Sequence, residues 1–343
     1  MGGARGERHL HKKVYMTLLD YRLTESNTLS VDGLDAHVGN TPLLPLHRLS
    51  RNLSPRVQVF AKAEWFNPGG SIKDRPALNI IQTALANGYL LPSPSSAAGT
   101  PPRAYKRLLD STSGNMGISY ATFGAALGIP ITLTIPASAS SERISILKAL
   151  GAELILTDPL EGSDGAILKA RELAAEHPDL YWYANQYNND ANWQAHYKST
   201  GPEIFCQTKE QVTHFVAGLG TSGTLMGTGR FLKEQLPHVK VIAFQPDAPF
   251  HGLEGLKHMA SAIKPGIYEE SFAEEQLQVM TEAAHAMVKR LAREEGLFVG
   301  ISSGAAAVAA LEVASRLDEG VVVTVFPDAG YKYLSDKLLW ENT

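Results

Sequence analysis

Lys73 is the residue whose type and setting most directly suggest chemistry in this sequence. It lies in the segment NPGGSIKDR (67–75), which follows a strand-like run and precedes a helix-like one. A lysine amine that has lost its proton can form a Schiff base with a carbonyl group, and burial or neighbouring cations favour loss of that proton. The segment alone is as typical of a surface lysine or a phosphate ligand, so it leaves the role of Lys73 open.

Two other segments suggest the binding of polar ligands. STSGNMG (111–117) gathers hydroxyls, an amide and free backbone N–H groups at the expected start of a helix. Such a group binds anions, for example a carboxylate, but it also occurs in ordinary helix caps. GISSGA (300–305) stands at a similar junction, where a serine either caps the helix or hydrogen-bonds to a ring nitrogen of a ligand.

A further segment, GLGTSGT (218–224), has the G-x-G-x-x-G spacing of a phosphate-binding turn. Asp247 follows at about the distance where dinucleotide-binding folds place a ribose-binding acid, so a dinucleotide is one candidate ligand. Thr221, Ser222 and Thr224 make the turn rich in hydroxyls, which suits a terminal phosphomonoester. A dinucleotide would also leave the lysine and the amide of the earlier segments without a role.

The elements that must position these segments alternate between strand and helix. Strands are predicted over 57–62, 131–135, 214–217, 239–244 and 321–326, and a long helix over 276–295. This alternation predicts an α/β fold with a mostly parallel sheet in each half, in which ligands bind where strands end and helices begin. The stretch 92–103, rich in Pro, Ser, Gly and Ala, is interpreted as a loop or surface insertion.

Composition excludes several classes of protein. Of 343 residues, 44% are hydrophobic and 19% charged, and the net charge of −4 argues against a nucleic-acid partner. No run of about 20 apolar residues predicts a membrane span, and no apolar run after the basic N-terminal residues predicts a secretory signal. The single cysteine, Cys206, excludes a disulfide within the chain and a cysteine-based zinc site. It suggests a reducing cytoplasm, and we expect it to be buried among apolar neighbours.

Taken together, the segments resemble the cysteine synthase and cystathionine β-synthase family of pyridoxal-phosphate enzymes. The resemblance implies fold type II, the tryptophan synthase β-like fold, with two three-layer αβα lobes and mostly parallel sheets. We expect an N-terminal extension over 1–35, a smaller lobe over 56–184, and a larger lobe over 36–55 plus 185–343. The matching stretches are VGNTPLLPL (38–46), NPGGSIKDRPA (67–77), STSGNMGIS (111–119), NQYNNDANWQAHYKSTGPE (185–203), THFVAGLGTSGTLMGTGRFLKE (213–234), GLFVGISSGAA (296–306) and PDAGYKYLSD (327–336).

The resemblance also implies roles for individual residues. Lys73 would carry the cofactor, pyridoxal 5′-phosphate, as a Schiff base, Asn115 would bind the 3′-oxygen of its ring, and Ser302 would face the ring nitrogen. The expected cradle of the cofactor phosphate is Gly220, Thr221, Ser222, Gly223 and Thr224. The residues expected to hold the substrate carboxylate are Thr112, Ser113, Gly114, Asn115, Met116 and Gln186.

The implied reaction is a β-replacement that forms L-cysteine from O-acetyl-L-serine or O-phospho-L-serine and a sulfur nucleophile, in a homodimer. The sequence departs from the family at three positions. Met116 stands where threonine is common, Ala329 where many members have serine, and Lys257 where the phosphoserine branch has a phosphate-binding arginine. Within the family, the stretches 213–234 and 327–336 most resemble this phosphoserine branch, the O-phosphoserine sulfhydrylases. We interpret Lys257 either as that phosphate ligand or as a solvated lysine, because lysine lacks the bidentate geometry of arginine.

Other functions stay open from the sequence. A cystathionine β-synthase would use homocysteine as the nucleophile, and a serine or threonine dehydratase would complete the reaction with water. A non-catalytic relative would bind without turnover; Lys73 and Asn115 argue against it, whereas Met116 keeps it open. The context of Lys73, followed by Asp74 and Arg75, resembles the synthases more than the dehydratases.

Overall fold

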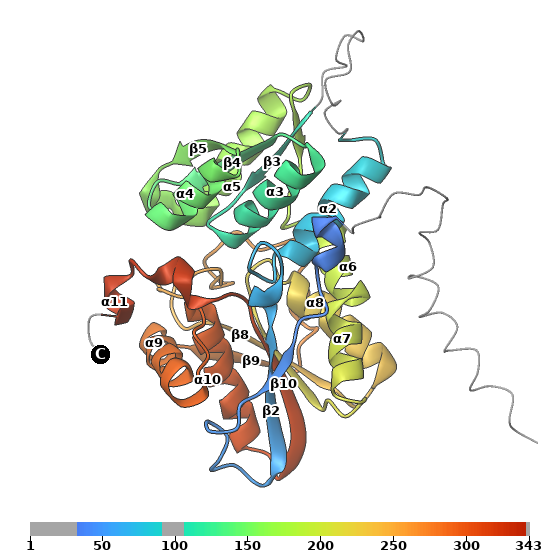
Figure 1. Ribbon diagram of the computed structural model, residues 1–343, viewed down its shortest axis with the longest axis vertical. Helices are drawn as coiled ribbons and strands as arrows, with labels where there is room; N and C mark the ends of the chain where they lie inside the picture. Colours follow the sequence, from blue (N-terminus) through green and yellow to red (C-terminus); the bar gives the residue numbers. More distant parts are fainter. Residues whose placement is uncertain (1–32, 91–105, 341–343) are drawn as a thin grey trace, which may run out of the picture. The chain divides into compact units, whose positions relative to one another are not determined.

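Two mostly parallel sheets organise the part of the chain that the computed structural model describes, residues 33–90 and 106–340 (Figure 1). The six-stranded sheet has the order β1 (Leu43–Pro45), β2 (Arg56–Ala63), β10 (Glu319–Phe326), β7 (His214–Gly218), β8 (Lys240–Pro246) and β9 (Glu275–Val279), and its β1–β2 pair is antiparallel. The four-stranded sheet has the order β5 (Glu153–Thr157), β4 (Ile131–Pro136), β3 (Arg107–Ser111) and β6 (Tyr181–Tyr183), all parallel. The predicted insertion 92–103 and all but the last three residues of the predicted extension 1–35 lie outside the described residues.

Helices follow the strands, and the predicted α/β fold with two layered regions is confirmed. The helices are α2 (Asp74–Ala86), α3 (Asn115–Leu127), α4 (Ser141–Ala149), α5 (Gly162–Glu176), α6 (Asp190–Lys198), α7 (Thr200–Gln207), α8 (Gly223–Gln235), α9 (Thr281–Arg290), α10 (Ile301–Ser315) and α11 (Lys337–Trp340). Turns of 3-10 helix lie at Leu34–His37, Glu64–Phe66, Pro159–Glu161 and Gly330–Tyr333, and a π turn at Leu291–Glu295 follows α9. None of the described helices is long and apolar enough to cross a membrane.

The six-stranded sheet carries a helical layer on each face. Successive side chains of a strand point to opposite faces, and Phe215 and Val216 of β7 accordingly belong to two different apolar clusters. Val216 packs in the cluster that contains residues of α9 and α10, whereas Phe215 packs in the cluster that contains residues of α8. Figure 1 shows these helices on either side of β10, which gives this sheet its three layers.

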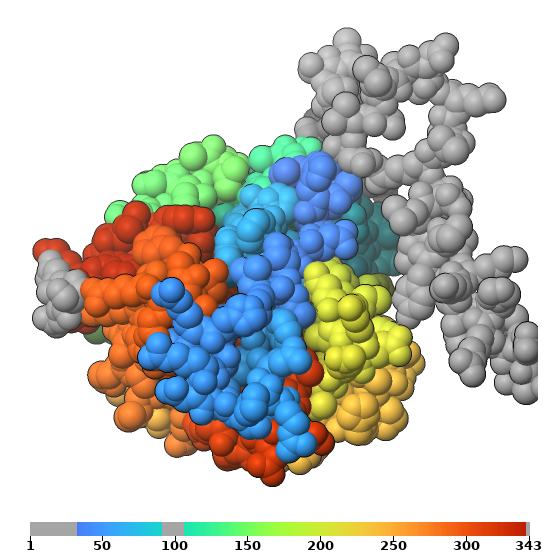
Figure 2. All heavy atoms as spheres, turned by 60° about the horizontal axis from the view of Figure 1, so that its bottom comes forward, coloured from blue at the N-terminus to red at the C-terminus, as the bar shows by residue number. Residues whose placement is uncertain are grey.

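The strand β2 corrects the predicted boundary of the smaller lobe. The sequence analysis assigns residues 56–184 to that lobe, but β2 pairs in parallel with β10 along its whole length, from Arg56 to Ala63. The reason is its alternating buried face, because Val57 and Val59 belong to the core beneath α9 and α10. In Figure 2, blue residues from early in the chain and red residues from late in the chain meet on one face of the molecule.

Two further predictions are wrong. The long helix predicted over 276–295 begins only at Thr281, because 275–279 form β9, where buried Leu277 and Val279 alternate with exposed glutamines at the period of a strand. Cys206 is exposed, not buried. The buried face of α7 includes Ile204, and a step of two residues turns about 200° around the helix, so Cys206 points away from the core.

Candidate active site

A cavity of about 540 Å³ lies at the ends of β3 and β7, a volume typical of small-molecule sites. Residues of the loops that connect both sheets to the following helices line it. It brings together every predicted site residue except Gly223. The predicted residues in its lining are Lys73, Thr112, Ser113, Gly114, Asn115, Met116, Gln186, Gly220, Thr221, Ser222, Thr224, Lys257 and Ser302.

Lys73 is the N-cap residue of α2, and its side chain lines the cavity. Burial lowers the pKa of its ammonium group, while the charges of Asp328 and Glu64 oppose this shift. Within the described residues, Nζ of Lys73 forms no hydrogen bond and no ion pair. The lowered pKa increases the fraction of neutral amine, so Lys73 can act as a nucleophile toward a carbonyl compound or as a base.

Asp74 holds the turn that precedes Lys73. Its buried carboxylate accepts hydrogen bonds from the backbone N–H of Gly69 and from Oγ of Ser119, each at 2.5 Å. Burial raises the pKa of Asp74 to about 6. A Cβ atom on residue 69 would lie 2.5 Å from Oδ1 of Asp74, so this approach requires glycine. The contact joins the lysine segment to α3, whose first turn lies within the segment 111–117.

A buried network of two cations and two carboxylates anchors the start of α2. Arg75 binds Glu64 through Nε at 2.7 Å and Glu203 through both terminal nitrogens, at 2.6 and 2.8 Å. Lys62 binds Glu203 at 2.6 Å and the backbone oxygen of Thr41 at 2.6 Å. The charges balance, which buried ionic groups require. Because Arg75 lies two residues after Lys73, the network fixes the helix that presents the lysine.

The segment 111–117 leaves backbone donors free at the start of α3. Thr112 accepts hydrogen bonds at Oγ1 from the N–H groups of Gly114 and Gly117, both at 3.0 Å, which shapes the turn. The N–H groups of Asn115 and Met116 have no such partner among the described residues. Free donors at a helix N-terminus attract anions. The segment is therefore suited to a carboxylate, as the sequence analysis expects.

Asp110 orders this segment from beneath, and the sequence analysis does not identify it. The carboxylate accepts hydrogen bonds from the hydroxyl of Tyr120 at 3.0 Å and from the N–H groups of Ser111 and Gln186, at 2.9 and 3.2 Å. Burial raises the pKa of Asp110 to about 7. Gln186 is fixed a second time, because its Nε2 donates to the backbone oxygen of Ser111 at 2.7 Å. Asp110 thus positions a residue predicted to bind substrate.

The amide of Asn115 is oriented by two charged side chains from the segment 327–336. Nδ2 of Asn115 donates to Oδ2 of Asp328 at 2.8 Å, and Oδ1 accepts from Nζ of Lys332 at 2.8 Å. Lys332 is buried and also donates to the backbone oxygen of Gly70 at 3.1 Å. PDAGYKYLSD (327–336) is one of the stretches that carry the family resemblance, but the sequence analysis assigns no role to Asp328 or Lys332. Their burial is visible only in the structure.

The segment 218–224 fits a phosphate group because one of its hydroxyls is unpartnered in the described part of the chain and because it lies at a helix N-terminus. Ser222 adopts a left-handed φ of 71°, and its buried Oγ has no hydrogen-bond partner among the described residues. A Cβ atom on Gly223 would lie 1.9 Å from Oδ1 of Asn192, and one on Gly220 would lie 2.4 Å from the backbone oxygen of Gly255. Both glycines are therefore required by their surroundings. Gly223 opens α8, whose N-terminus adds a partial positive charge.

Ser302, Met116 and Ala329 have distinct positions. Ser302 lies in the first turn of α10 and lines the cavity. Met116 lines the cavity too, but most of its side chain is buried in the core of the four-stranded sheet. Its backbone N–H stays available to a ligand although a threonine hydroxyl is absent. Ala329 is buried and bridges to Val299, next to the start of α10.

Lys257 is not the solvated lysine that one interpretation of the sequence describes. Only 6% of its side chain is exposed, and Nζ forms an ion pair with Asp164 at 2.7 Å. The ammonium also lies 5.1 Å from the ring centroid of Tyr187. The sequence analysis does not identify Asp164, because nothing in the spacing of residues 164 and 257 indicates that they meet.

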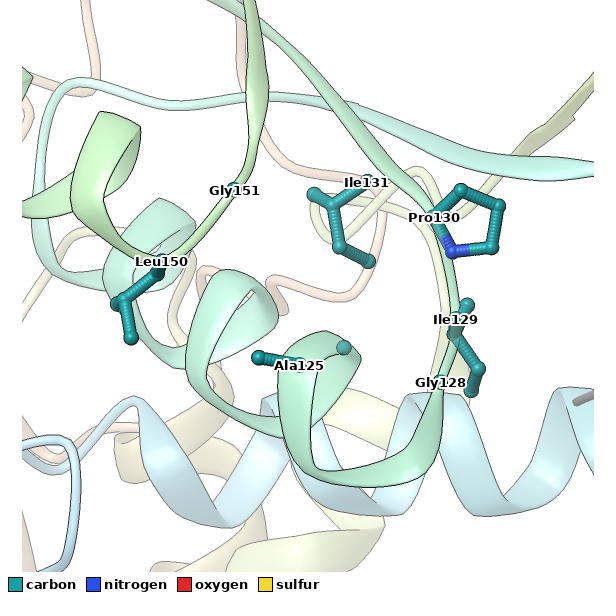
Figure 3. Close-up of a pocket in the computed structure, with 8 residues that line it drawn as sticks. Ala125, Gly128, Ile129, Pro130, Ile131, Leu150 and Gly151 are labelled. Atoms are coloured by element: carbon teal, nitrogen blue, oxygen red, sulfur yellow. The ribbon is translucent and has the colours of Figure 1, made fainter. Parts of the chain in front are cut away.

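A second cavity, of about 350 Å³, offers no comparable chemistry. Glycine, alanine, proline, leucine and isoleucine residues line it, and Figure 3 shows the side chains of Ala125, Ile129 and Ile131 around it. Among residues 33–90 and 106–340, no group of three His, Cys, Asp or Glu side chains could hold a metal ion. The titratable groups that could carry a reaction lie in the larger cavity.

Comparisons with known proteins agree with this geometry. A "Cysteine synthase" of Aquifex aeolicus is 51% identical over 306 residues, 88% of this chain and 90% of that protein. The crystal structure of a cysteine synthase from Entamoeba histolytica has a TM-score of 0.82 at 32% identity, covering 93% and 94% of the two chains. That of an O-acetylserine dependent cystathionine beta-synthase from Helicobacter pylori has a TM-score of 0.81 at 32% identity, covering 90% and 99%.

The sequence profile of one protein family spans most of the cavity's residues. It is described as "Pyridoxal-phosphate dependent enzyme" and matches residues 34–328, which include Lys73, the segment 111–117 and the segment 218–224. The amine of Lys73, which has no partner among the described residues, and the glycine-rich turn 218–224 at the start of α8 suit this cofactor, because it attaches to a lysine and carries a phosphate. With 51% identity to a relative along most of its length as well, the chain belongs to the pyridoxal-phosphate-dependent enzymes.

Proposed function

We propose that this enzyme is a cysteine synthase, which replaces the β-substituent of O-acetyl-L-serine or O-phospho-L-serine by a sulfur nucleophile and forms L-cysteine. The observation that carries the proposal is the convergence in one cavity of Lys73 and the segments 111–117 and 218–224. The relatives named cysteine synthase support the same reaction. In the overall change, the bond from Cβ to the ester oxygen breaks, a bond from Cβ to sulfur forms, and acetate or phosphate leaves.

The proposed cofactor site uses groups that line the cavity, together with Gly223 beside them. Lys73 would attach the cofactor, Asn115 and Ser302 would bind its ring, and Gly220, Thr221, Ser222, Gly223 and Thr224 would hold its phosphate. When bound, pyridoxal phosphate supplies an electron sink that makes the bonds at Cα of the substrate easier to break. The lowered pKa of Lys73 suits the protein's part, because a neutral amine can take the Cα proton and return it after the sulfur nucleophile adds.

The proposed substrate site lies at the start of α3. The free N–H groups of Asn115 and Met116, with Thr112, Ser113, Gly114 and Gln186, would hold the carboxylate of the amino acid. Gln186 is held rigidly by its bond to Ser111, which limits the motion of the substrate relative to Lys73. Lys257 lines the same cavity, and the phosphate of O-phosphoserine would compete with Asp164 for its ammonium group.

The test is to incubate the purified enzyme and cofactor with sulfide and either O-acetylserine or O-phosphoserine, and to measure cysteine. We expect cysteine from at least one substrate, and none from Lys73→Ala even where that variant still binds the cofactor. A wild-type enzyme that binds pyridoxal phosphate but forms no cysteine from either substrate contradicts the proposal.

A second candidate reaction uses homocysteine as the nucleophile and forms cystathionine. The likeness to the O-acetylserine dependent cystathionine beta-synthase favours it. Product analysis with sulfide and homocysteine offered separately distinguishes the two reactions.

We also propose a homodimer in a reducing cytoplasm. The family resemblance supports the dimer, and the exposed thiol of Cys206 suits a compartment that keeps thiols reduced. Light scattering of the holoenzyme tests the dimer.

A further inference from the structure

Lys257 and Asp164 form an ion pair inside the cavity, from opposite parts of the fold. Lys257 follows β8 of the six-stranded sheet, and Asp164 lies in the first turn of α5, which packs on β3 and β4 of the other sheet. Nζ and Oδ1 are 2.7 Å apart. Both residues line the cavity that also contains Lys73. The pair therefore belongs to the surroundings of the reacting groups.

The partners hold each other in fixed positions. The backbone N–H of Lys257 donates to the backbone oxygen of Leu219 at 2.7 Å, so the residue is attached to the glycine-rich turn 218–224. The second carboxylate oxygen of Asp164 accepts a hydrogen bond from the N–H of Ile263 at 2.8 Å. A buried ammonium group needs a compensating charge, and Asp164 provides it. The positive charge of Lys257 is thus already compensated by Asp164 before any ligand binds.

This neutralisation distinguishes between the two candidate leaving groups. A phosphate ester carries between one and two negative charges at neutral pH, whereas an acetyl ester carries none. A phosphoryl group near Lys257 would meet a cation that is already paired, and it would be repelled by the carboxylate of Asp164. An acetyl group would meet neither effect.

We propose that Asp164 is a specificity-determining residue, which biases the enzyme against an anionic leaving group by holding the ammonium of Lys257. The proposal rests on the proposed β-replacement on serine esters and names a residue that sets its substrate class. Replacement of Asp164 by asparagine removes the charge, keeps the shape and keeps an oxygen for Ile263. The ammonium of Lys257 then becomes free to bind a phosphoryl group.

The loop that carries Lys257 has a second attachment that does not involve Asp164. Glu254, three residues earlier, forms an ion pair with Arg143 of α4, whose side chain is only 5% exposed. Arg143 also lies 5.1 Å from the ring centroid of Tyr333. In this ion pair the cation comes from the helix beside the four-stranded sheet and the carboxylate from the loop, the reverse of the pair between Asp164 and Lys257. The Asp164→Asn variant should therefore keep the loop docked.

The experiment compares kcat/KM for O-phosphoserine and O-acetylserine, with sulfide, in the holoenzyme and three variants. In Asp164→Asn, we expect the ratio of phosphoserine to acetylserine to rise about tenfold, as for loss of one charge near a dianion in a partly screened pocket. Glu161→Gln is the matched control: it removes an exposed carboxylate that lines the same cavity without binding Lys257. Its ratio should stay near the wild-type value. Asp164→Asn combined with Lys257→Gln should lose the gain.

Three outcomes overturn the proposal: equal changes for both substrates in Asp164→Asn, the same ratio change in Glu161→Gln, or a gain that survives Lys257→Gln. If the wild-type enzyme turns over acetylserine alone, the readout is the inhibition constant of O-phosphoserine, which should fall about tenfold in Asp164→Asn. Failure of the proposed function is separate, because the wild-type holoenzyme would then form no cysteine from either substrate.

Discussion

Replacing Glu203 by glutamine tests the buried network that anchors the helix after Lys73. Glu203 accepts hydrogen bonds from two nitrogens of Arg75, at 2.6 and 2.8 Å, from Nζ of Lys62 at 2.6 Å, and from the N–H of Asn40 at 3.0 Å. Glutamine keeps one acceptor oxygen but points an amide donor at these cations. It also leaves two buried cations opposite the single carboxylate of Glu64.

The expected loss of stability follows from that imbalance. Breaking a buried ion pair on one side costs about 3–5 kcal/mol. Because 14% of the side chain of Glu203 is exposed, we expect about 3 kcal/mol, near the lower end of that range. With an unfolding entropy of about 2.1 cal/mol/K per residue, the melting temperature should fall by about 4 °C.

The assays are urea unfolding, for the free energy of unfolding, and thermal unfolding, for the melting temperature, of the wild-type enzyme and its variants at neutral pH, both followed by circular dichroism. Glu319→Gln is the control, because its ion pair with Arg56 spans 3.3 Å and both side chains are about 70% exposed; it should lose less than about 1 kcal/mol. Adding Lys62→Met to Glu203→Gln restores the charge balance and should recover part of the loss. Equal losses in Glu203→Gln and Glu319→Gln would refute the reasoning.

Three further predictions concern the cavity. Burial raises the pKa of Asp110 from 3.8 to about 7, so the folded state holds the proton more tightly than the unfolded state. The free energy of unfolding should therefore fall as the pH rises from about 4 to about 7. Asp110→Asn should flatten this fall, as measured by urea unfolding at pH 5 and pH 8. Gly223→Ala should weaken cofactor binding at least about tenfold by spectral titration, because the new Cβ would meet Asn192, and adding Asn192→Ala should restore part of the affinity. Lys332→Met should raise KM for the amino-acid substrate about tenfold, since the amide of Asn115 loses a donor from a charged group; an unchanged KM would contradict that role.

The sequence predicted the parallel α/β fold, and it predicted thirteen of the residues that line the cavity, because both depend on local patterns. The strand-to-helix junctions at 67–75, 111–117 and 218–224 each carry glycines and polar groups at fixed spacing, and parallel sheets bring such junctions to one edge. β9 was mistaken for helix because Leu277 and Val279 continue into the apolar pattern of α9. Five residues are too few for a period of two to outweigh the longer helical pattern.

Long-range pairing explains what the sequence could not predict. The place of β2 depends on β10, whose residues lie more than 250 positions later in the chain. The ion pair of Lys257 with Asp164 and the orientation of Asn115 by Lys332 likewise join distant positions. Such contacts follow from how the two sheets and their loops pack in three dimensions, so no local spacing encodes them. Cys206 differs, because its helical phase relative to Ile204 could have indicated exposure.

The position of β10 between β2 and β7 has a consequence for folding during synthesis. β3, β4, β5 and β6 are complete by residue 183, so the smaller sheet can form from one continuous stretch of chain. The larger sheet cannot, because its first strands lack their neighbour until Glu319–Phe326 leaves the ribosome. At about 5–20 residues per second, this delay lasts roughly 10–50 s. Over that time the edge of β2 stays unpaired on that side, and an unpaired strand edge can pair with another chain and promote aggregation.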